Sequence, residues 1–368
     1  MNKPLKNAKA VRIYIEYLRN AKRRSESTIT AVERALTTFE QGIKGADFAD
    51  FNRRIAMTFT EWLEEEGRTG SGTSAKQMYS VLRHVRAFLL WLAFRPGYKS
   101  RIAVDDIEYL SMDRQKLQEA RATNLVDWPS KEHVLKLVDS IEGQSELAMR
   151  DRALISLLFL SGMRDSAVAS LPLGCFDPEK LEIHQSPAMG VHTKFGKDMV
   201  THLFVFDDRL STLVLDWYNY LKDQKLFSSR DPLFPRNKVV RNSETGAFES
   251  VVVERAFWQG AGPIRDIVRR RSEAAGLPYY KPHAFRHATA QLAAKQCASL
   301  EELRVVSQNL GHENVGTTLT SYGKVSPGRV REVMSTVDFA RSGNELFDAD
   351  FKRKLNLLVN QPIKELDK

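Results

Sequence analysis

Two arginines and two histidines beyond residue 160 have the types and spacing needed to hold a tetrahedral anion. Arg164 follows an apolar run and a glycine in SGMRDSAVASL, and His283 and Arg286 lie three positions apart in KPHAFRHATA. That spacing puts both side chains on one face of a helix. His312 follows in LGHENVGTTLTSY. Guanidinium groups grip the non-bridging oxygens of a phosphate, so the four residues together predict phosphoryl-transfer chemistry.

Tyr322 and Lys194 would supply the remaining chemistry of such a site. Tyr322 is the last tyrosine of the chain and comes ten positions after His312. A tyrosine has an ordinary pKa of about 10, so nearby cations and a histidine base would favour the attacking phenolate. Lys194 lies in the turn sequence VHTKFGK, from which it could protonate the leaving oxygen. Preorganised donors of this kind stabilise a pentacoordinate transition state without a metal ion.

Each of these residues also has an ordinary structural interpretation. An arginine after a helix end often complements the helix dipole, a lysine in a turn is often only solvated, and an HxxR pair can be a surface hydrogen-bond couple. A tyrosine is commonly a half-buried packing residue. The catalytic interpretation therefore rests on the residues as a group, in this order along the chain.

The excess positive charge is confined to the first hundred residues. The chain carries 55 Lys and Arg against 46 Asp and Glu, and the whole excess of nine lies within residues 1–104. Residues 67–104 contain seven basic residues and no acidic one. This asymmetry predicts a polyanionic partner, most simply DNA or RNA, held by an N-terminal module. Lys76, Arg83 and Arg86 project from the polar side of a predicted helix as candidate DNA contacts, with a solvated surface face as the alternative.

The periodicity of apolar residues predicts a mainly helical chain in two domains. A helical core DNA-binding domain over residues 1–110 would be followed by an interdomain linker at 111–128 and a catalytic domain at 129–368. Helices are predicted at about 8–22, 27–41, 50–66, 74–94, 130–141, 146–161, 208–224, 250–275, 283–295, 300–309, 314–322 and within 345–359. Strands at 181–185 and 199–206 would form a small antiparallel sheet with VHTKFGK between them.

Composition excludes several other classes of protein. The 42% hydrophobic and 27% charged residues are ordinary for a globular protein, and the longest apolar runs are too short to span a bilayer. The N-terminal residues contain no apolar signal sequence, so we expect a cytoplasmic protein. Cys175 and Cys297 favour free thiols, and no zinc, calcium or P-loop motif is present. We therefore expect neither a cofactor nor a metal.

The order of these motifs resembles that of the tyrosine recombinases, the phage-integrase family. SGMRDSAVASL is similar to the family's G-[LM]-R-x-x-E-x-x-x-L segment, and TKFGKDMVTHLFV to its GKGxKxRxVPL hairpin. HAFRHATA is similar to HxLRHxxA, and LGHENVGTTLTSY to LGHxxxxTTxxY. The resemblance covers Trp128 to Val333, and the basic N-terminal helices resemble the family's SAM-like core-binding domain. It implies a mainly α fold with a small antiparallel sheet, in which this helical domain precedes a mixed α/β catalytic domain.

The resemblance also implies a role for each candidate residue. The six catalytic residues would be Arg164 and Arg286 as phosphate clamps, His283 as base, His312 as second donor, Lys194 as general acid and Tyr322 as nucleophile. The alignment of the hairpin selects Lys194 rather than Lys197. The implied activity is site-specific cleavage and rejoining of double-stranded DNA through a 3′-phosphotyrosyl intermediate, without metal or ATP, in a mobile genetic element.

The implied assembly is a homotetramer on synapsed recombination sites and a monomer when free, helped by accessory DNA-bending or directionality proteins. Such a protein would have no membrane partner and would be associated with the nucleoid when bound to DNA. The predicted tail helix within 345–359 has an apolar stripe, so it could pack on a neighbouring subunit in trans.

Two departures from the family pattern leave alternatives open. The position three after Arg164, usually Glu, is Ala167, so a substitute acid must come from Asp165 or elsewhere, or activity is reduced. Tyr322 lies ten positions after His312, where nine is commoner. One alternative is therefore a DNA-binding protein of the same fold that has lost strand cleavage. Another is a type IB topoisomerase, which shares the chemistry.

Overall fold

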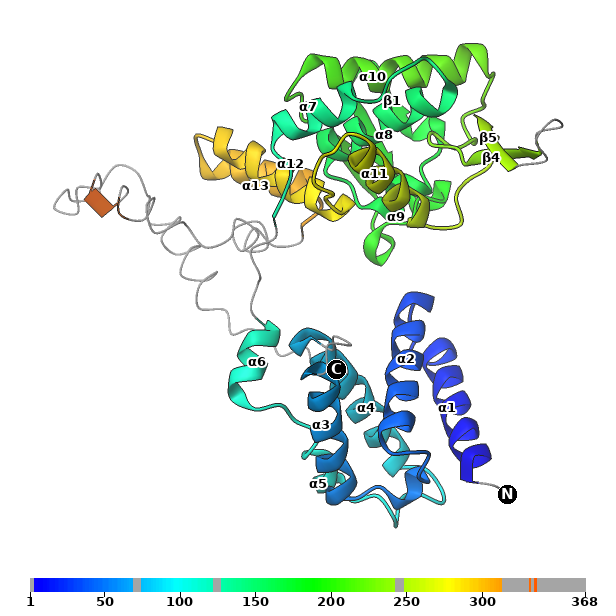
Figure 1. The fold of residues 1–368 in the computed structure, drawn as a ribbon, viewed down its shortest axis with the longest axis vertical. Helices are drawn as coiled ribbons and strands as arrows, with labels where there is room; N and C mark the ends of the chain where they lie inside the picture. The colour runs from blue at the N-terminus through cyan, green and yellow to red at the C-terminus, as the bar shows by residue number, and fades with distance from the viewer. Residues whose placement is uncertain are drawn as a thin grey trace. The chain divides into compact units, whose positions relative to one another are not determined.

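The chain divides into two compact units, residues 1–124 and 125–368, which we describe separately (Figure 1). The computed structural model describes residues 3–68, 74–121, 127–241 and 248–312, together with 331, 334 and 335. Tyr322, the predicted helix at 314–322 and the predicted tail helix lie outside the described residues. Among the described residues, no helix is both long enough and apolar enough to cross a membrane.

Long helices build the described part of the N-terminal unit. Its elements are α1 (Lys3–Asn20), α2 (Glu26–Gly42), η1 (Phe48–Asp50), α3 (Arg53–Arg68), α4 (Ala75–Ala93), α5 (Val104–Ile107) and α6 (Arg114–Arg121). Ser74 and Gln77 form a reciprocal capping box that sets the start of α4. Helix α4 packs against α2, and the core between the helices is rich in fully buried aromatic side chains, among them Phe39, Phe48, Phe59 and Phe88.

Helix α6 lies inside the segment 111–128 that we expected to be a linker. It packs against α4, and Lys116 Nζ lies 2.6 Å from Glu64 Oε2 of α3. Ala120 of α6 is buried. The helix was not predicted because the segment is mostly polar. Its few inward-facing residues attach it to the N-terminal unit.

Helix α8 lies at the centre of the second unit. It packs against α7 (Lys131–Asp139), α10 (Asp208–Asn219), α11 (Gly262–Ala274) and α12 (Pro282–Gln296), and Figure 1 shows it enclosed by these helices. Its bounds, Glu146–Ser161, are those that the sequence predicts. Ser145 caps the start by accepting a hydrogen bond from Ala148 N, and Gly162 ends the helix in the left-handed region, with φ 58°. Because α8 is covered on nearly all sides, its run ALISLLFL needs no polar face.

Short elements join α8 to the helices around it. The described elements of this unit are α7 (Lys131–Asp139), α8 (Glu146–Ser161), α9 (Asp165–Ala169), η2 (Leu173–Cys175), β1 (Phe176–Asp177), β2 (Glu182–Gln185), η3 (Pro187–Met189), η4 (Lys194–Gly196), β3 (Met199–His202), α10 (Asp208–Asn219), the π-helical turn η5 (Tyr220–Gln224), β4 (Asn237–Arg241), β5 (Phe248–Val253), α11 (Gly262–Ala274), α12 (Pro282–Gln296) and α13 (Leu300–Asn309).

The first sheet presents the predicted lysine turn. Its three antiparallel strands lie in the order β1-β2-β3, with Ile183 opposite Thr201. Lys194 lies in the connection between β2 and β3. Strand β3 ends at His202, earlier than expected, because Phe204 N donates a hydrogen bond to Leu160 O (2.7 Å) and the chain turns onto α8.

The second sheet is a two-stranded hairpin that corrects one prediction. We expected a helix over 250–275, but β5 runs to Val253 and helix α11 begins only at Gly262. Strand β5 pairs antiparallel with β4, with Asn237 opposite Val253. Three consecutive valines are β-branched and favour a strand when a partner strand is available. The prediction was wrong because it extended the helical pattern of α11 across them.

A buried ion network fastens this region to α8. The side chain of Arg150 is fully buried, and its Nη1 donates to Pro235 O (3.0 Å) and to the Asn237 side chain. Its Nη2 lies 2.8 Å from Asp151 Oδ1. The other carboxylate oxygen of Asp151 accepts from Arg271 Nε of α11 (2.8 Å). Two neighbouring residues of α8 therefore hold both β4 and α11.

We predict that Arg150→Met lowers the free energy of unfolding by about 3 kcal/mol, because it leaves Asp151 and two carbonyl acceptors short of a buried donor. Urea unfolding of the full chain measures this change. The control is Lys180→Met, which removes an exposed pair in which Lys180 Nζ lies 3.5 Å from Asp177 Oδ2. That control should change stability by less than about 0.5 kcal/mol. Equal losses in the two variants would contradict the role of the network.

Candidate active site

Arg286 of α12 is the buried cation around which the predicted site residues gather. Its side chain is almost fully buried, at 6% exposure. Its Nη1 donates to Gly162 O at the end of α8 (2.7 Å), and its Nη2 donates to Leu310 O at the end of α13. Burial and the charge of Arg164 lower the pKa of Arg286 to about 9. The guanidinium therefore stays charged near neutral pH, and it is not the surface couple that the HxxR spacing also allowed.

Arg164 lies directly before α9 and brings a second positive charge to Arg286. It is half-buried, and within the described parts of the chain its guanidinium has no hydrogen-bond or ion-pair partner. The carbonyl of Gly162 is bonded to Arg286 instead, so Arg164 does not cap α8. Partial burial lowers the pKa of Arg164. Two like charges this close, without a carboxylate partner among the described residues, favour binding of an anion.

Two histidines complete the cluster around the arginines. Partial burial, His287, Arg286 and Arg164 all lower the pKa of His283. Burial and then the two arginines lower the pKa of His312 to about 4. Both imidazoles are therefore neutral near pH 7 and able to accept a proton. His287, which we did not predict as a site residue, meets His283 edge to face with ring centroids 4.8 Å apart.

The turn between β2 and β3 brings Lys194 to the same place. A pocket of about 120 Å³ is lined by Arg164, Lys194 and His312 among others. Lys194 Nζ lies 4.8 Å from the ring centroid of Phe195, an exposed residue held at φ 63°. Lys197 lines the pocket as well. The structure thus brings together five of the six predicted catalytic residues, and the sixth, Tyr322, lies outside the described residues.

Asn309 places His312 beside the sheet, a contact that no sequence motif indicated. Its Oδ1 accepts from His202 N (2.7 Å) and its Nδ2 donates to His202 O (2.9 Å), so the last residue of α13 continues the hydrogen bonding of β3. Gly311 follows with φ 70°, and a Cβ there would lie 2.7 Å from Met199 Sδ. The left-handed φ and the close approach to Met199 both favour glycine at this position before His312.

The acid expected after the first arginine is absent from its usual position. Ala167 is buried in the core at 1% exposure. Asp165 of α9 instead accepts from Arg265 Nε of α11 through Oδ2 (2.9 Å) and from Ser166 N through Oδ1 (2.9 Å). The sequence left the source of a substitute acid open, and nothing in it pointed to Arg265.

The three candidate DNA contacts of the N-terminal unit lie on the polar side of α4. Lys76 and Arg83 are exposed. Arg86 is partly buried, and its Nη2 lies 3.4 Å from Glu108 Oε1. In the sequence, Glu108 comes after the acid-free stretch 67–104. In the fold, its side chain lies next to Arg86 of that stretch. Lys76 and Arg83 are therefore better candidates for phosphate contacts than Arg86.

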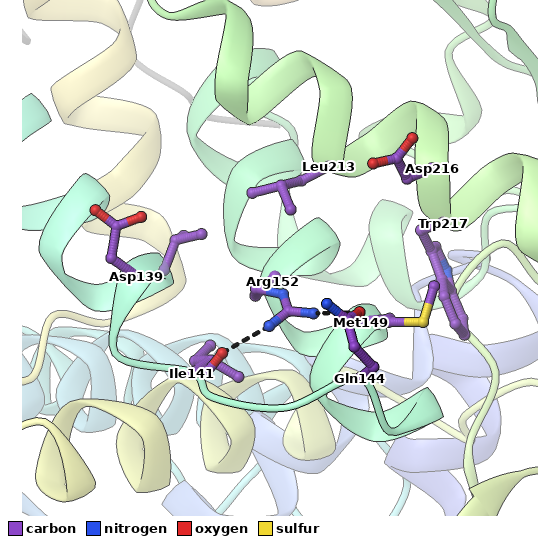
Figure 2. A pocket seen from close by; sticks show the side chains of 9 residues that line it. Asp139, Ile141, Gln144, Met149, Arg152, Leu213, Asp216 and Trp217 are labelled. Carbon is purple, nitrogen blue, oxygen red and sulfur yellow. Dashed lines mark hydrogen bonds between the residues drawn. The ribbon is translucent and has the colours of Figure 1, made fainter.

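A larger pocket, of about 310 Å³, lies elsewhere in the second unit (Figure 2). Arg152 of α8 donates to Ile141 O (2.7 Å) at its edge, and Asp139 and Asp216 carry carboxylates on either side in this view. None of the predicted catalytic residues lines it. We place the candidate site at the smaller pocket because the arginines and histidines converge there.

Comparison with known proteins identifies the family. Residues 128–329 match the model of the phage integrase family, and residues 11–92 match the phage integrase N-terminal SAM-like domain. The chain belongs to the phage integrase family. It is 25% identical to the tyrosine recombinase XerD of Oceanobacillus iheyensis, over 88% of this chain and 96% of that protein. The tyrosine recombinase XerC of Mannheimia succiniciproducens is 24% identical, over 83% and 89%.

These relatives confirm the predicted enzyme class, that of the tyrosine recombinases. Solved integrase structures confirm the predicted fold. A lambda integrase dimer bound to a core site aligns with a TM-score of 0.57 and 14% identity, covering 87% of this chain and 97% of that one. The Tn1549 transposon integrase in complex with transposon right-end DNA aligns with a TM-score of 0.53 and 15% identity, covering 89% and 98%.

The low pKa of His312 predicts a contribution to stability that depends on pH. An unfolded histidine titrates near 6.5, whereas folded His312 has a pKa of about 4, so the unfolded chain binds the proton first as pH falls. Stability is therefore lost as pH decreases through the unfolded value towards the folded one. We expect His312→Gln to lose less stability than the wild type between about pH 7.5 and pH 5.

Urea unfolding of the full chain at each pH measures the effect. The control is His192→Gln, which replaces an exposed histidine of the same unit and should retain the wild-type slope. Parallel pH curves for the wild type and His312→Gln would contradict the buried position of His312 beside the arginines.

Proposed function

We propose that the protein is a site-specific DNA recombinase that forms a covalent 3′-phosphotyrosyl link through Tyr322. The observation that carries this proposal is the pair of cations Arg164 and Arg286: the charge of Arg164 lowers the pKa of Arg286, and both side chains lack a carboxylate partner in the described parts of the chain. A phosphodiester supplies the missing negative charge. The compared lambda and Tn1549 integrases are complexes with DNA, which makes double-stranded DNA the natural source of that phosphodiester.

The arginines bind the scissile phosphate before any bond changes. Arg164 and Arg286 each donate to a non-bridging oxygen, and His312 donates a further hydrogen bond to the same group. Arg286 is fixed by its bonds to two helix ends, so it needs no rearrangement when charge develops on the phosphate. Donors preorganised in this way stabilise the transition state more than the ground state.

Strand cleavage then exchanges one phosphoester bond for another. The phenolic oxygen of Tyr322 attacks phosphorus while His283, neutral because its pKa is lowered, accepts the phenolic proton. The bond from phosphorus to the 5′ oxygen breaks, and Lys194 protonates that oxygen as it leaves. The 3′-phosphotyrosyl link keeps the phosphodiester energy, so the 5′-hydroxyl of a partner strand rejoins the DNA by the reverse reaction without ATP.

The proposed assembly on DNA is a homotetramer, with the free protein a cytoplasmic monomer. Two subunits cut one strand of each DNA partner, and exchange of those strands gives a Holliday junction that the other two subunits resolve. Lys76 and Arg83 of the N-terminal unit contact the phosphate backbone. In this proposal, accessory DNA-bending or directionality proteins assist the reaction, and the recombinase belongs to a mobile genetic element.

A second candidate function is a DNA-binding protein of the same fold that no longer cleaves DNA. The observation that favours it is Ala167, which is buried where the family pattern has an acid. We favour the recombinase because five predicted catalytic residues meet in one cluster and Asp165 supplies a carboxylate beside it.

A nicked suicide substrate carrying the cognate site tests the nucleophile. The wild type should form a protein–DNA adduct that survives denaturation, and Tyr322→Phe should form none, because the phenylalanine ring has no oxygen to attack phosphorus. Tyr279→Phe, at a tyrosine outside the proposed site, is the matched control and should retain the adduct.

Two other results of this experiment, and one result of a plasmid-relaxation assay, would each change the assignment. An adduct that persists in Tyr322→Phe refutes the nucleophile. No adduct from the wild type on a proven cognate site favours the binding-only protein. Relaxation of supercoiled plasmids without any dependence on the site favours a type IB topoisomerase.

Deletion of residues 340–368 should weaken assembly on DNA, because apolar residues at helical spacing in this tail would no longer pack on the neighbouring subunit. These residues are Leu346, Phe347, Phe351, Leu355 and Leu358. Analytical ultracentrifugation with paired recombination sites measures the synaptic complex, and binding to a single half-site is the control. Undiminished synapsis by the shortened chain would rule out this role of the tail.

A further inference from the structure

Asp165 and Arg265 form an ion pair immediately next to Arg164. Arg265 of α11 approaches one oxygen of the carboxylate with two nitrogens, Nε at 2.9 Å and Nη2 at 2.8 Å from Oδ2. The other oxygen, Oδ1, accepts from Ser166 N at 2.9 Å. Both oxygens of Asp165 are thus engaged, and its side chain is only 21% exposed. The side chain of Arg265 is 53% exposed, so the pair contributes little to stability, but its two nitrogens fix the orientation of the carboxylate.

The ion pair restrains the backbone from which the side chain of Arg164 extends. Helix α9 is a short element that begins at Asp165, and Arg164 is the residue before its first turn. The carbonyl of Arg164 accepts from Ala167 N (3.0 Å) and Val168 N (3.1 Å), so the start of α9 and the backbone of Arg164 move together. A link from Asp165 to the much longer helix α11 therefore restrains the arginine as well.

Asp165 also brings negative charge to a cluster of cations and histidines. Among the groups that shift the pKa of His283, the others lower it and Asp165 raises it. The charged and titratable groups around His283 are Arg164 and Asp165 of α9, Arg286 and His287 of α12, His312 after α13, and Arg265 of α11 beyond the carboxylate. Within the described residues, the carboxylate of Asp165 therefore supplies negative charge that acts on His283.

We propose that Asp165, oriented by Arg265, is a positioning residue that replaces the acid missing at Ala167: it restrains Arg164 and places one negative charge beside His283. This inference rests on the proposed strand-transfer function. A pair that only joins α9 to α11 would restrain the arginine without acting on the histidine. The two possibilities differ in the pH dependence of cleavage.

The test measures the rate of adduct formation on the suicide substrate as a function of pH. Protonation of His283 sets the acid limb of this profile if His283 accepts the phenolic proton. Asp165→Asn removes the carboxylate, lowers the pKa of His283 and shifts the acid limb to lower pH. Arg265→Gln keeps the carboxylate but removes its counterion, which raises the pKa of His283 and shifts the limb to higher pH.

Both variants should also cleave more slowly at the pH optimum, by roughly 10- to 100-fold, because the start of α9 is no longer held. Opposite shifts of the acid limb support the proposal. Shifts in the same direction, or slower cleavage with no shift, overturn it, because a purely structural pair loses the same contact in either variant.

Exchanging the two residues distinguishes the effect of the ion pair as a contact from the effect of the negative charge at position 165. Asp165→Arg with Arg265→Asp restores an ion pair but places a third cation beside Arg164. The proposal predicts that cleavage stays slow in this double variant, and recovery of the wild-type rate would overturn it. Asp165→Glu keeps the charge and should retain the wild-type acid limb.

Asp266→Asn is the matched control, because it removes an exposed pair on the same helix, in which Arg269 Nη1 lies 3.4 Å from Asp266 Oδ1. It should leave both rate and pH profile unchanged. Thermal unfolding confirms that each variant is folded. A wild type that forms no adduct refutes the proposed function, whereas a wild-type adduct with like-signed shifts in the variants refutes only the role of Asp165.

Discussion

The buried guanidinium of Arg286 is the constraint on which the rest of the site depends. It donates to the carbonyls of Gly162 and Leu310, which end α8 and α13. Arg164 and His312 each come two residues after one of these carbonyls. The two hydrogen bonds of Arg286 therefore also place the second arginine and a histidine around it. A single side chain thereby organises segments from three distant parts of the sequence.

The electrostatic consequence of this packing is a buried cation next to a second one, which favours an anionic ligand. Burial and the charge of Arg164 lower the pKa of Arg286, yet it remains about 9. Burial, and then the charges of both arginines, lower the pKa of His312 to about 4 and keep it neutral near pH 7. In the proposed reaction, a phosphodiester would relieve the repulsion between the arginines, and the neutral histidines would move the protons that phosphoryl transfer requires.

Local sequence patterns predicted the elements that local interactions form. The bounds of α8 follow from the cap at Ser145, an apolar run and Gly162, all of which act within the helix or next to it. The motifs around Arg164 and Arg286 were recognised for the same reason. The β4–β5 hairpin was missed because the helical pattern of α11 was extended across its valines, and its attachment to Arg150 through Asn237 of β4 spans 87 positions. Likewise, Asp165 meets Arg265 across 100 positions, a distance at which no single-sequence pattern indicates a contact.

The most direct measurement is a crystal structure of the full chain bound to DNA that contains an intact cleavage site. We expect the guanidinium groups of Arg164 and Arg286 to donate to two non-bridging oxygens of one phosphate, at N–O distances of about 2.7–2.9 Å. The hydroxyl of Tyr322 should face the phosphorus atom of that phosphate, opposite the 5′ oxygen. A scissile phosphate held elsewhere, with the two arginines contacting different phosphates or none, would contradict the central claim.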